Sequence, residues 1–222
     1  MNSPDLELKQ LCCERDERVL FRHFDMRLFP GDIVQIGGPN GCGKTTLLRI
    51  LTTVSQDYRG EIFWRGAPLS RNRLDYLNHL IYLSHLPSVK KALSPRDNLR
   101  WFSGMSSGHR QLPLEEALAC VGLFGYEDVP CYTLSAGQLR RVALARLYLT
   151  PARIWILDEP FTAIDKQGVA RLEQLLTEHA AGGGAVILTT HQPLALARVR
   201  YINLEDFQPE GWELDAEAEV AG

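Results

Sequence analysis

Hydrophobic and polar residues alternate in the first part of the chain. Phe24, Met26 and Leu28 are separated by charged residues, and this period of two predicts a strand with one buried face. The run Glu61–Trp64 is also strand-like, and a turn at Gly66 follows it. We therefore expect a small β-lobe in the N-terminal part of the chain.

Further along the chain, apolar residues form continuous runs instead. Ile33–Ile36, Ile154–Leu157 and Ala185–Thr190 are short and largely apolar, which is typical of strands buried on both faces of a parallel sheet. Segments with helical character accompany them: Lys44–Thr53, Pro95–Phe102, Leu114–Val121, Ala136–Leu149 and Lys166–Ala181. Strands that alternate with helices predict an α/β domain with a largely parallel core sheet. The helical middle, about residues 86–150, is expected to be a subdomain inserted in it.

The predicted helix that begins at residue 136 is amphipathic. Leu139, Ala143 and Leu147 share one helical face. The same pattern places Arg140 and Arg141 mostly outside that apolar face.

The charge of the chain changes near its C-terminus. After Arg200 the sequence has no Lys or Arg, but it has seven acidic residues: Glu205, Asp206, Glu210, Glu213, Asp215, Glu217 and Glu219. Such a run is typical of a solvated, partly disordered end, and a regulatory tail is the alternative. We expect residues 1–204 to form one domain and residues 205–222 to form an acidic C-terminal tail.

Composition excludes several broad classes of protein. The 222 residues are 45% hydrophobic and 23% charged, with a formal net charge of −3, so the chain has an ordinary globular composition and no bulk attraction to nucleic acid. No apolar run reaches the roughly 18 to 20 residues of a membrane span, and the first residues lack the pattern of a signal peptide, so we expect no secretion. The five cysteines show no Cys-x-x-Cys spacing, which predicts reduced thiols.

Residues 38–45 fit the phosphate-loop pattern G-x-x-x-x-G-K-[ST]. A buried strand precedes the loop and a helix follows it, as the motif requires. Its glycines let backbone N–H groups turn toward a polyphosphate, and the helix N-terminus adds a partial positive charge. Lys44 is expected to neutralise the β- and γ-phosphates, and the Thr45 hydroxyl to bind Mg²⁺. The expected nucleotide-binding residues of this loop are Gly38, Pro39, Asn40, Gly41, Cys42, Gly43, Lys44, Thr45 and Thr46.

Two carboxylates follow the apolar run Ile154–Leu157 directly. In an open α/β sheet, ligands bind at the carboxyl ends of the strands. Asp158 is therefore placed to hold Mg²⁺, directly or through water, and Glu159 is free to act as a base on an attacking water. Asp-Glu pairs are common on protein surfaces; the buried strand and the phosphate loop favour the functional interpretation here.

A third segment, residues 134–138, opens a predicted helix with the sequence Leu-Ser-Ala-Gly-Gln. Ser135 and Gln138 have the spacing of a capping box, which is a purely structural interpretation. Gly137, however, costs about 1 kcal/mol of helix propensity relative to Ala, and a bare backbone suits the close approach of an anion to a helix N-terminus. The chain would then have two phosphate-binding helix starts for one nucleotide, and sharing between two subunits would resolve this.

Together these residues resemble the ATP-binding-cassette (ABC) ATPases, over nearly the whole chain to about Leu204. Leu134–Gln138 looks like the family signature, Trp155–Pro160 like its Walker B motif, Ala163–Asp165 like its D-loop and Thr189–His191 like its switch histidine. The resemblance implies a P-loop NTPase core with a mostly parallel sheet, an N-terminal antiparallel β-lobe and an inserted α-helical subdomain.

The resemblance also implies the chemistry and the cofactors, ATP and Mg²⁺. Water oriented by Glu159 and His191 would attack the γ-phosphate, Lys44 would hold that phosphate, and Thr45 and Asp158 would hold the metal. Positioning and charge stabilisation then do most of the catalysis.

The family pattern further implies a second ATPase subunit. Two cassettes would pair head to tail as a homodimer, so that each ATP lies between one phosphate loop and Ser135, Gly137 and Gln138 of the other chain. Asp165 belongs to the same nucleotide-binding set.

The sequence also resembles a narrower group, the ATPase subunits of the haem exporters of cytochrome c maturation (the Ccm system). Residues 13–18, 134–149, 155–165 and 189–194 carry this likeness. It implies an ATPase of haem transport that binds separate transmembrane subunits at the cytoplasmic face of the bacterial inner membrane. The chain would be peripheral, with its membrane contact made through those partners. Haem as the substrate rests on this resemblance, because no residue points to a haem contact.

Two departures from the family pattern affect the expected site. An aromatic residue usually precedes the phosphate loop and stacks on adenine, but Leu11–Arg18 contains none, which predicts weak selectivity for the base. A glutamine usually follows the second core strand, but Ile81–Ser88 contains none. We expect His85 to take the glutamine's place and the membrane partner to dock on Ser84–Trp101. The alternative is that His85 only caps the strand.

Three other functions stay open on the sequence. The nearest alternative is an ABC ATPase for another substrate. A soluble, non-transport ABC ATPase that acts on ribosomes or DNA usually has two cassettes, a coiled-coil insertion or a basic surface, and this sequence has none of them. A kinase would need an acceptor site and would transfer phosphate to a small molecule rather than to water.

Overall fold

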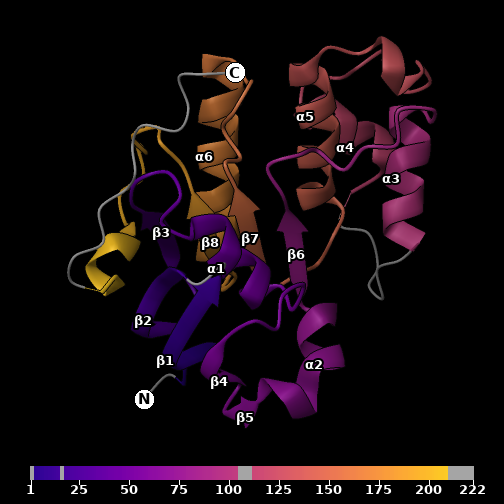
Figure 1. Cartoon of the computed structure of the whole chain (residues 1–222). Helices are drawn as coiled ribbons and strands as arrows, with labels where there is room; N and C mark the ends of the chain where they lie inside the picture. Colours follow the sequence, from indigo (N-terminus) through magenta and orange to yellow (C-terminus); the bar gives the residue numbers. More distant parts are fainter. Residues whose placement is uncertain (1–2, 16–17, 105–111, 210–222) are drawn as a thin grey trace.

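The computed structural model describes residues 3–15, 18–104 and 112–209, and Figure 1 shows how they are arranged. A four-stranded sheet lies toward the N-terminal end, a five-stranded sheet forms the centre, and helices α3, α4 and α5 stand to one side of it. The predicted architecture of β-lobe, parallel core sheet and inserted helical subdomain is confirmed.

The first sheet has the strand order β2-β1-β4-β5 and is antiparallel throughout. Phe24, Met26 and Leu28 are buried, whereas Asp25 and Arg27 between them are exposed, so the alternation marks a half-buried strand as expected. The strands are β1 (Leu6–Arg15), β2 (Arg18–Leu28), β4 (Arg59–Trp64) and β5 (Ala67–Pro68).

The core sheet has the order β6-β7-β8-β3-β9, and every neighbouring pair of strands is parallel. Its strands are β3 (Ile33–Gly37), β6 (Leu80–Leu83), β7 (Ile154–Asp158), β8 (Ala185–Thr189) and β9 (Arg200–Asn203). β7 and β8 are buried along their whole length, as parallel strands covered on both faces should be. Because the strands all run in one direction, the loops that follow β3, β6, β7 and β8 leave the sheet at the same edge.

Helices cover both faces of the core sheet, and the sheet separates the buried apolar residues into two clusters. Helix α1 (Lys44–Leu51) packs on one face, with Ile154 and Ile156 of β7. Helix α6 (Lys166–Ala181) packs on the opposite face, with Trp155 and Leu157 of the same strand. Helix α2 (Leu69–Asn78) contacts the first sheet and belongs to the α1 cluster through Tyr76. No helix in the described ranges combines the length and apolar character needed to cross a bilayer.

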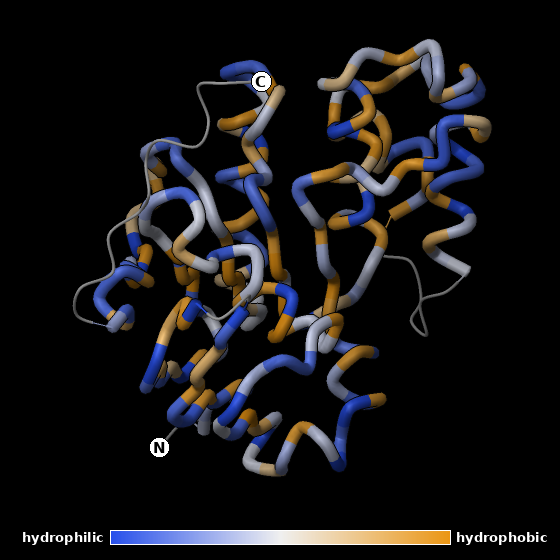
Figure 2. The backbone as a smooth tube through the Cα atoms, in the orientation of Figure 1, coloured by the Kyte–Doolittle hydropathy of each residue, from blue (hydrophilic) through white to orange (hydrophobic). Residues whose placement is uncertain are grey.

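The helical unit has a small core of its own, which includes Leu99, Leu118 and Val142. Its elements are α3 (Pro95–Gly104), α4 (Leu114–Cys120), α5 (Ala136–Ala145) and two 3₁₀ turns, η1 (Cys131–Thr133) and η2 (Arg146–Tyr148). In Figure 2, hydrophobic and hydrophilic residues alternate along these helices, as expected where one face is buried. The predicted helix Ala136–Leu149 is an α-helix only as far as Ala145, because its last turn tightens into η2.

The chain leaves the core sheet through a final 3₁₀ turn, η3 (Leu204–Phe207). Leu204 is fully buried, and the ring of Phe207 packs edge-on against Phe24 at a centroid distance of 4.8 Å. Packed structure therefore continues a few residues beyond the expected boundary at Leu204. The rest of the expected acidic tail, residues 210–222, lies outside the described residues.

Candidate functional site

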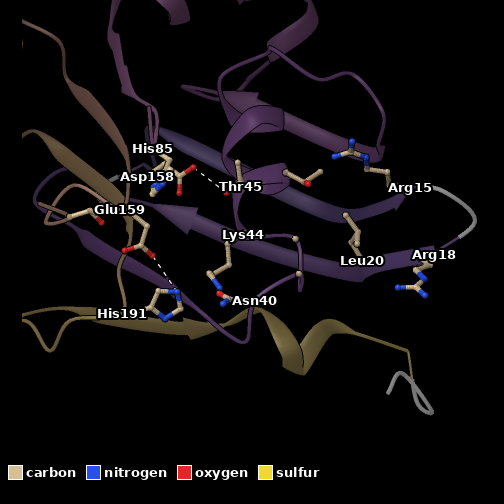
Figure 3. A pocket seen from close by; sticks show the side chains of 14 residues that line it. Arg15, Arg18, Leu20, Asn40, Lys44, Thr45, His85, Asp158, Glu159 and His191 are labelled. Carbon is tan, nitrogen blue, oxygen red and sulfur yellow. Dashed lines mark hydrogen bonds and ion pairs between the residues drawn. The ribbon is translucent and has the colours of Figure 1, made fainter. Parts of the chain in front are cut away.

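The loops at the carboxyl edge of the core sheet surround a cavity of about 710 Å³. Figure 3 shows Lys44 near its middle, Glu159 and His191 at one end, and Arg15, Arg18 and Leu20 toward the other. The cavity is lined by Arg15, Arg18, Leu20, Asn40, Gly41, Gly43, Lys44, Thr45, Thr46, His85, Asp158, Glu159, Thr162 and His191.

The phosphate loop depends on glycine at specific positions. Gly38 has a φ of +125°, and a Cβ there would lie 2.8 Å from the sulfur of Cys42. Gly43 has a φ of +101° and is the N-cap of α1, but as a glycine it offers no side-chain cap. The first backbone N–H groups of α1 therefore lack a side-chain acceptor and point toward the loop, where an anion can bind them.

Lys44 closes the loop onto itself. Its Nζ donates to the carbonyl oxygens of Gly38 at 2.8 Å and Pro39 at 2.9 Å. The ammonium group is thus held over the loop that a polyphosphate would enter. A phosphate oxygen can take over as acceptor with a small movement of a flexible side chain.

Asp158 is 2% exposed and is held by two hydroxyl groups. Thr45 Oγ1 donates to its Oδ2 at 3.1 Å, and Thr189 Oγ1 donates to its Oδ1 at 2.7 Å. A hydroxyl and a carboxylate that already meet form an oxygen donor set of the kind Mg²⁺ prefers, since this ion usually takes one or two carboxylates together with substrate phosphates. These residues fit a magnesium ion.

Glu159 combines a strained backbone with a buried carboxylate oxygen that has no hydrogen-bond partner among the described residues. Its φ is +49°, a left-handed conformation that costs on the order of 1–2 kcal/mol for a residue with a Cβ, and its N–H donates to Thr189 Oγ1 at 3.0 Å. Oε1 is buried and has no hydrogen-bond partner among the described residues. His191 Nε2 lies 3.5 Å from this oxygen. An unsatisfied acceptor of this kind is ready to receive a proton donor such as water.

The signature segment has a different character. Ser135 Oγ accepts from the Gln138 N–H at 3.2 Å, and Gln138 Oε1 accepts from the Ser135 N–H at 2.9 Å, so the capping box is present. A Cβ on Gly137 would lie 2.6 Å from the Ala163 carbonyl oxygen. Within one chain, then, this glycine is required by the D-loop that packs against it.

Asp165 also acts within its own chain. It is the N-cap of α6, with Oδ1 accepting from the Gly168 N–H at 2.8 Å and Oδ2 accepting from Arg141 at 2.8 Å. The Gly168 N–H and then the Arg141 guanidinium lower the pKa of this carboxyl below its ordinary value. The structure thus gives Asp165 a capping role and no place in the cavity wall.

The structure separates the expected site residues into groups. Asn40, Gly41, Gly43, Lys44, Thr45, Thr46, His85, Asp158, Glu159 and His191 come together in the wall of the 710 Å³ cavity. Gly38 and Pro39 line an adjoining cavity of about 530 Å³ that shares Lys44 and His191 with the first. Cys42 is fully buried beneath the loop, and burial raises the pKa of its thiol. Ser135, Gly137, Gln138 and Asp165 do not line the cavity.

The wall that faces away from Glu159 contains residues that the motifs did not indicate. Arg15, Arg18 and Leu20 lie where β1 ends and β2 begins. A further lining residue without a motif, Thr162, lies beside Glu159 instead and donates its N–H to the Glu159 carbonyl oxygen at 3.3 Å. Among the described residues that line the cavity, none is Phe, Tyr or Trp. The absence of an aromatic residue from Leu11–Arg18 was the sequence signal that this wall differs from the usual family pattern.

Arg140 is the main correction to the sequence analysis. The pattern placed it outside the apolar face of its helix, but its side chain is only 3% exposed. Its guanidinium group donates to backbone carbonyl oxygens at the ends of β6 and β7. Arg140 has the helical spacing of Ala136, Ala143 and Leu147, and this spacing could have revealed the burial.

Comparison with known proteins identifies relatives along nearly the whole chain. A family model described as ABC transporter matches residues 21–162. The cytochrome c biogenesis ATP-binding export protein CcmA of Pseudomonas fluorescens is 48% identical over 205 residues, which are 92% of this chain and 97% of that protein. The protein of the same name from Hahella chejuensis is 52% identical over 203 residues, or 91% of this chain and 96% of that one.

Solved structures share the fold. A protein from Pyrococcus furiosus described as an ABC transporter (ATP-binding protein) has a TM-score of 0.78 and 26% identity, covering 92% of this chain and 99% of its own. An ATP-binding cassette solved as a dimer in a post-hydrolysis state, bound to ADP and Pi, has a TM-score of 0.76 at 21% identity, covering 90% of this chain and 94% of its own.

Proposed function

The chain belongs to the ABC transporter family, and from this premise we propose that it is the ATP-hydrolysing subunit of an export complex that serves cytochrome c biogenesis. The reaction is the hydrolysis of ATP to ADP and phosphate. The observation that carries the proposal is the buried oxygen Oε1 of Glu159, which has no hydrogen-bond partner among the described residues and lies in the same cavity as Lys44, Thr45 and Asp158. Relatives that bear the export name match over nearly the whole chain.

The phosphate loop binds the polyphosphate of ATP. The N-terminus of α1 presents backbone N–H groups and a partial positive charge. Lys44 adds a full positive charge that neutralises the β- and γ-phosphates. Both interactions are directed at phosphate oxygens, so binding strength comes mainly from the part of the nucleotide that all nucleoside triphosphates share.

The Thr45 hydroxyl and the Asp158 carboxylate are the protein ligands that would hold Mg²⁺. The metal supplies charge neutralisation and Lewis-acid polarisation of phosphate oxygens when it is bound. Thr189 supports this arrangement because it donates to Asp158 and also accepts from the Glu159 N–H. One threonine thereby fixes the metal ligand and the next residue together.

Glu159 acts as the general base, and His191 holds it in place. Oε1 has no hydrogen-bond partner among the described residues, so it can accept a proton from an attacking water. His191, at 3.5 Å from that oxygen, is exposed enough to reach the γ-phosphate as well. Alignment of water between these groups lowers the entropic part of the barrier.

A second copy of the chain completes each hydrolytic site. Ser135, Gly137 and Gln138 lie outside the cavity of their own chain, so they can contact a nucleotide only when another copy presents them. We infer a head-to-tail homodimer with one ATP between each phosphate loop and the partner's signature segment. Support for this arrangement comes from the shared fold of a cassette that was solved as a dimer with ADP and Pi.

Separate transmembrane subunits would place the chain at the cytoplasmic face of the bacterial inner membrane, as a peripheral protein. Haem is the proposed cargo, and its support is the similarity to export proteins of cytochrome c biogenesis. Affinity purification of the complex around this chain tests the cargo directly. Copurified membrane subunits with the absorption spectrum of haem are expected; a complex that carries a different bound molecule would favour an ABC ATPase for another substrate.

The ATPase proposal is tested with the purified full chain. With Mg²⁺, the wild-type chain should release phosphate from ATP. Lys44→Ala should slow hydrolysis by about 100-fold or more, because the positive charge of the lysine that neutralises the γ-phosphate is gone. Lys9→Ala is the matched control, since Lys9 lies on β1 outside the cavity. Equal rates for the wild type and Lys44→Ala would contradict the proposal.

A further inference from the structure

Arg140 is a buried cation that the ATPase chemistry does not use directly. It lies on α5, five positions after the helix N-cap at Ser135, and its side chain is 3% exposed. Fully buried arginines are rare unless their charge is satisfied. The groups that accept hydrogen bonds from its guanidinium show which parts of the chain Arg140 connects.

Every N–H group of the guanidinium has a carbonyl acceptor. A guanidinium carries five N–H donors in a planar fork. Nη1 donates to two carbonyl oxygens at the end of β6, and Nη2 and Nε donate to three carbonyl oxygens at the end of β7. The acceptors are Ser84 at 2.7 Å, His85 at 3.3 Å, Asp158 at 2.9 Å, Glu159 at 2.8 Å and Pro160 at 3.4 Å.

The acceptors are all backbone atoms, which makes the contact independent of side-chain identity in those loops. Burial lowers the pKa of Arg140, and the nearby charges of Asp158 and Glu159 oppose this effect. Because arginine stays protonated at any physiological pH, the fork remains a permanent brace between the two strand ends. Loss of the guanidinium would leave five carbonyl oxygens without this donor.

One side of the brace holds the catalytic turn. Glu159 has its strained φ of +49°, and its backbone is fixed at both ends of the residue. The N–H donates to Thr189 Oγ1, and the C=O accepts from Arg140. Arg140 thereby helps to set the direction in which Oε1 of Glu159 points.

The other side of the brace holds the segment that leaves the core sheet for the helical subdomain. Ser84 and His85 are the first two residues after β6, and His85 lines the cavity. Leu86, the next residue, is 73% exposed. This is the segment on which we expect the membrane subunit to dock, and it contains no glutamine that could reach the catalytic site.

We propose that Arg140 is a positioning residue that couples the segment after β6 to the catalytic turn at Glu159. A shift of the Ser84 and His85 carbonyl groups moves the guanidinium, and the guanidinium moves the Glu159 peptide. The brace thus gives the docking segment a backbone link to the catalytic turn, in addition to the contact that we expect of the His85 side chain. The inference rests on the proposed ATPase function.

Arg140→Gln and Arg140→Lys test the brace in the purified full chain. Gln is too short and has two donors, whereas Lys keeps the charge but presents a single donor atom. For both variants we expect kcat to fall by about 100-fold, the cost of a misplaced catalytic group. The KM for ATP and the Kd for a non-hydrolysable ATP analogue should stay within about threefold of wild type, because Arg140 does not touch the phosphate loop. Should the glutamine variant fail to fold, the lysine variant decides.

Arg146→Gln is the matched control. Arg146 lies at the end of the same helix with its guanidinium 3.6 Å from the centre of the Phe102 ring, and burial lowers its pKa to about 10. It makes none of the five carbonyl contacts. Its variant should lose thermal stability and keep kcat.

Hydrogen exchange separates coupling from simple support. In the wild type, the ATP analogue should slow exchange at the phosphate loop and also at residues 84–89. In the Arg140 variants, the phosphate loop should still respond and residues 84–89 should not. A brace without a coupling role would raise exchange at 84–89 equally with and without nucleotide.

Several results would overturn the inference: a kcat within about threefold of wild type, a loss of nucleotide affinity that matches the loss of kcat, or an unchanged nucleotide response at 84–89. Full recovery of kcat in Arg140→Lys would also overturn it, because charge alone would then suffice. A wild-type chain that hydrolyses no ATP would instead contradict the proposed function. Wild-type hydrolysis with a fully active Arg140→Gln would contradict the coupling alone.

Discussion

The phosphate loop and the signature segment are both helix starts, but they differ in what remains unsatisfied. At α1, Gly43 provides no side-chain cap, and Oε1 of Glu159 in the same cavity has no hydrogen-bond partner among the described residues. At α5, Ser135 and Gln138 satisfy each other in a reciprocal capping box. The first helix start needs a ligand, whereas the second is complete without one.

This difference indicates how the work is divided between copies of the chain. Polar groups left unsatisfied in a buried position cost free energy, and function is the usual reason for such groups. Glu159 Oε1 bears that cost, and the N-terminus of α1, which has no side-chain cap, lines the same cavity, so a single chain is prepared for nucleotide. The signature segment bears none and lies outside the cavity. Its contribution to hydrolysis must therefore come from a partner copy.

Of the variants that test this difference between the two helix starts, Glu159→Gln should have the largest effect on ATP hydrolysis. The amide keeps the shape of the side chain but cannot accept a proton, so hydrolysis should fall by about 100-fold or more. ATP binding should persist because Lys44 and Asp158 remain. Phosphate release and nucleotide binding measured on the same preparation check both parts; hydrolysis at the wild-type rate would place the base elsewhere.

A smaller effect is expected from His85, which lines the cavity and lies within the expected docking segment Ser84–Trp101. His85→Ala should bind ATP normally but lose stimulation by the membrane subunits, since Ala cannot hydrogen-bond to water or hydrated Mg²⁺. His85→Gln should retain the stimulation because its amide carbonyl is an acceptor.

Leu86→Ala is the control for this prediction, since Leu86 is the exposed neighbour. ATPase rates of the purified membrane complex distinguish the variants. A silent His85→Ala with a critical Leu86→Ala would mean that the coupling contact is apolar packing.

The smallest effect concerns the base. The cavity wall opposite Glu159 includes Arg15, Arg18 and Leu20, and none of the described residues that line the cavity is a Phe, Tyr or Trp that could stack on adenine. ATP and GTP should bind within about 1 kcal/mol of each other, because the contacts are directed mainly at phosphates. A competition titration measures the difference, and a hundredfold preference for ATP would show that the base is recognised after all.

The sequence was sufficient for the features that depend on local chemistry. The phosphate loop follows β3, Asp158 ends β7 and Glu159 comes directly after it, close to where the apolar runs and motifs predicted them. Parallel pairing then brings these loops to one edge of the sheet, so local motifs lead to a shared cavity. The expected roles of the individual residues remain predictions until the variants are measured.

The features that depend on tertiary packing could not be predicted in the same way. The helical pattern can indicate that Arg140 is buried, but it cannot indicate the acceptors of its guanidinium group, which are backbone carbonyl oxygens at the ends of β6 and β7, 56 and 18 positions away in sequence. The need for Gly137 arises in part from the Ala163 carbonyl, which is 26 positions away in sequence and would lie 2.6 Å from a Cβ. The 3₁₀ turn that replaces the last turn of the predicted helix Ala136–Leu149 is also set by packing in the helical unit.

The central claim is that each hydrolytic site joins the phosphate loop of one copy to the signature segment of another, and dimerisation in the Glu159→Gln background tests it most directly. With ATP, this variant should shift on a sizing column from 25.0 kDa to twice that mass, because ATP binds and is not consumed. A second change at Ser135 decides whether the signature is involved: Ser135→Asn and Ser135→Asp both retain an N-cap acceptor, but only the aspartate brings a negative charge toward the partner's phosphates. The account predicts an ATP-dependent dimer with Ser135→Asn and a monomer with Ser135→Asp. A dimer that forms equally well with Ser135→Asp, or an ATP-saturated Glu159→Gln that stays monomeric, would contradict it.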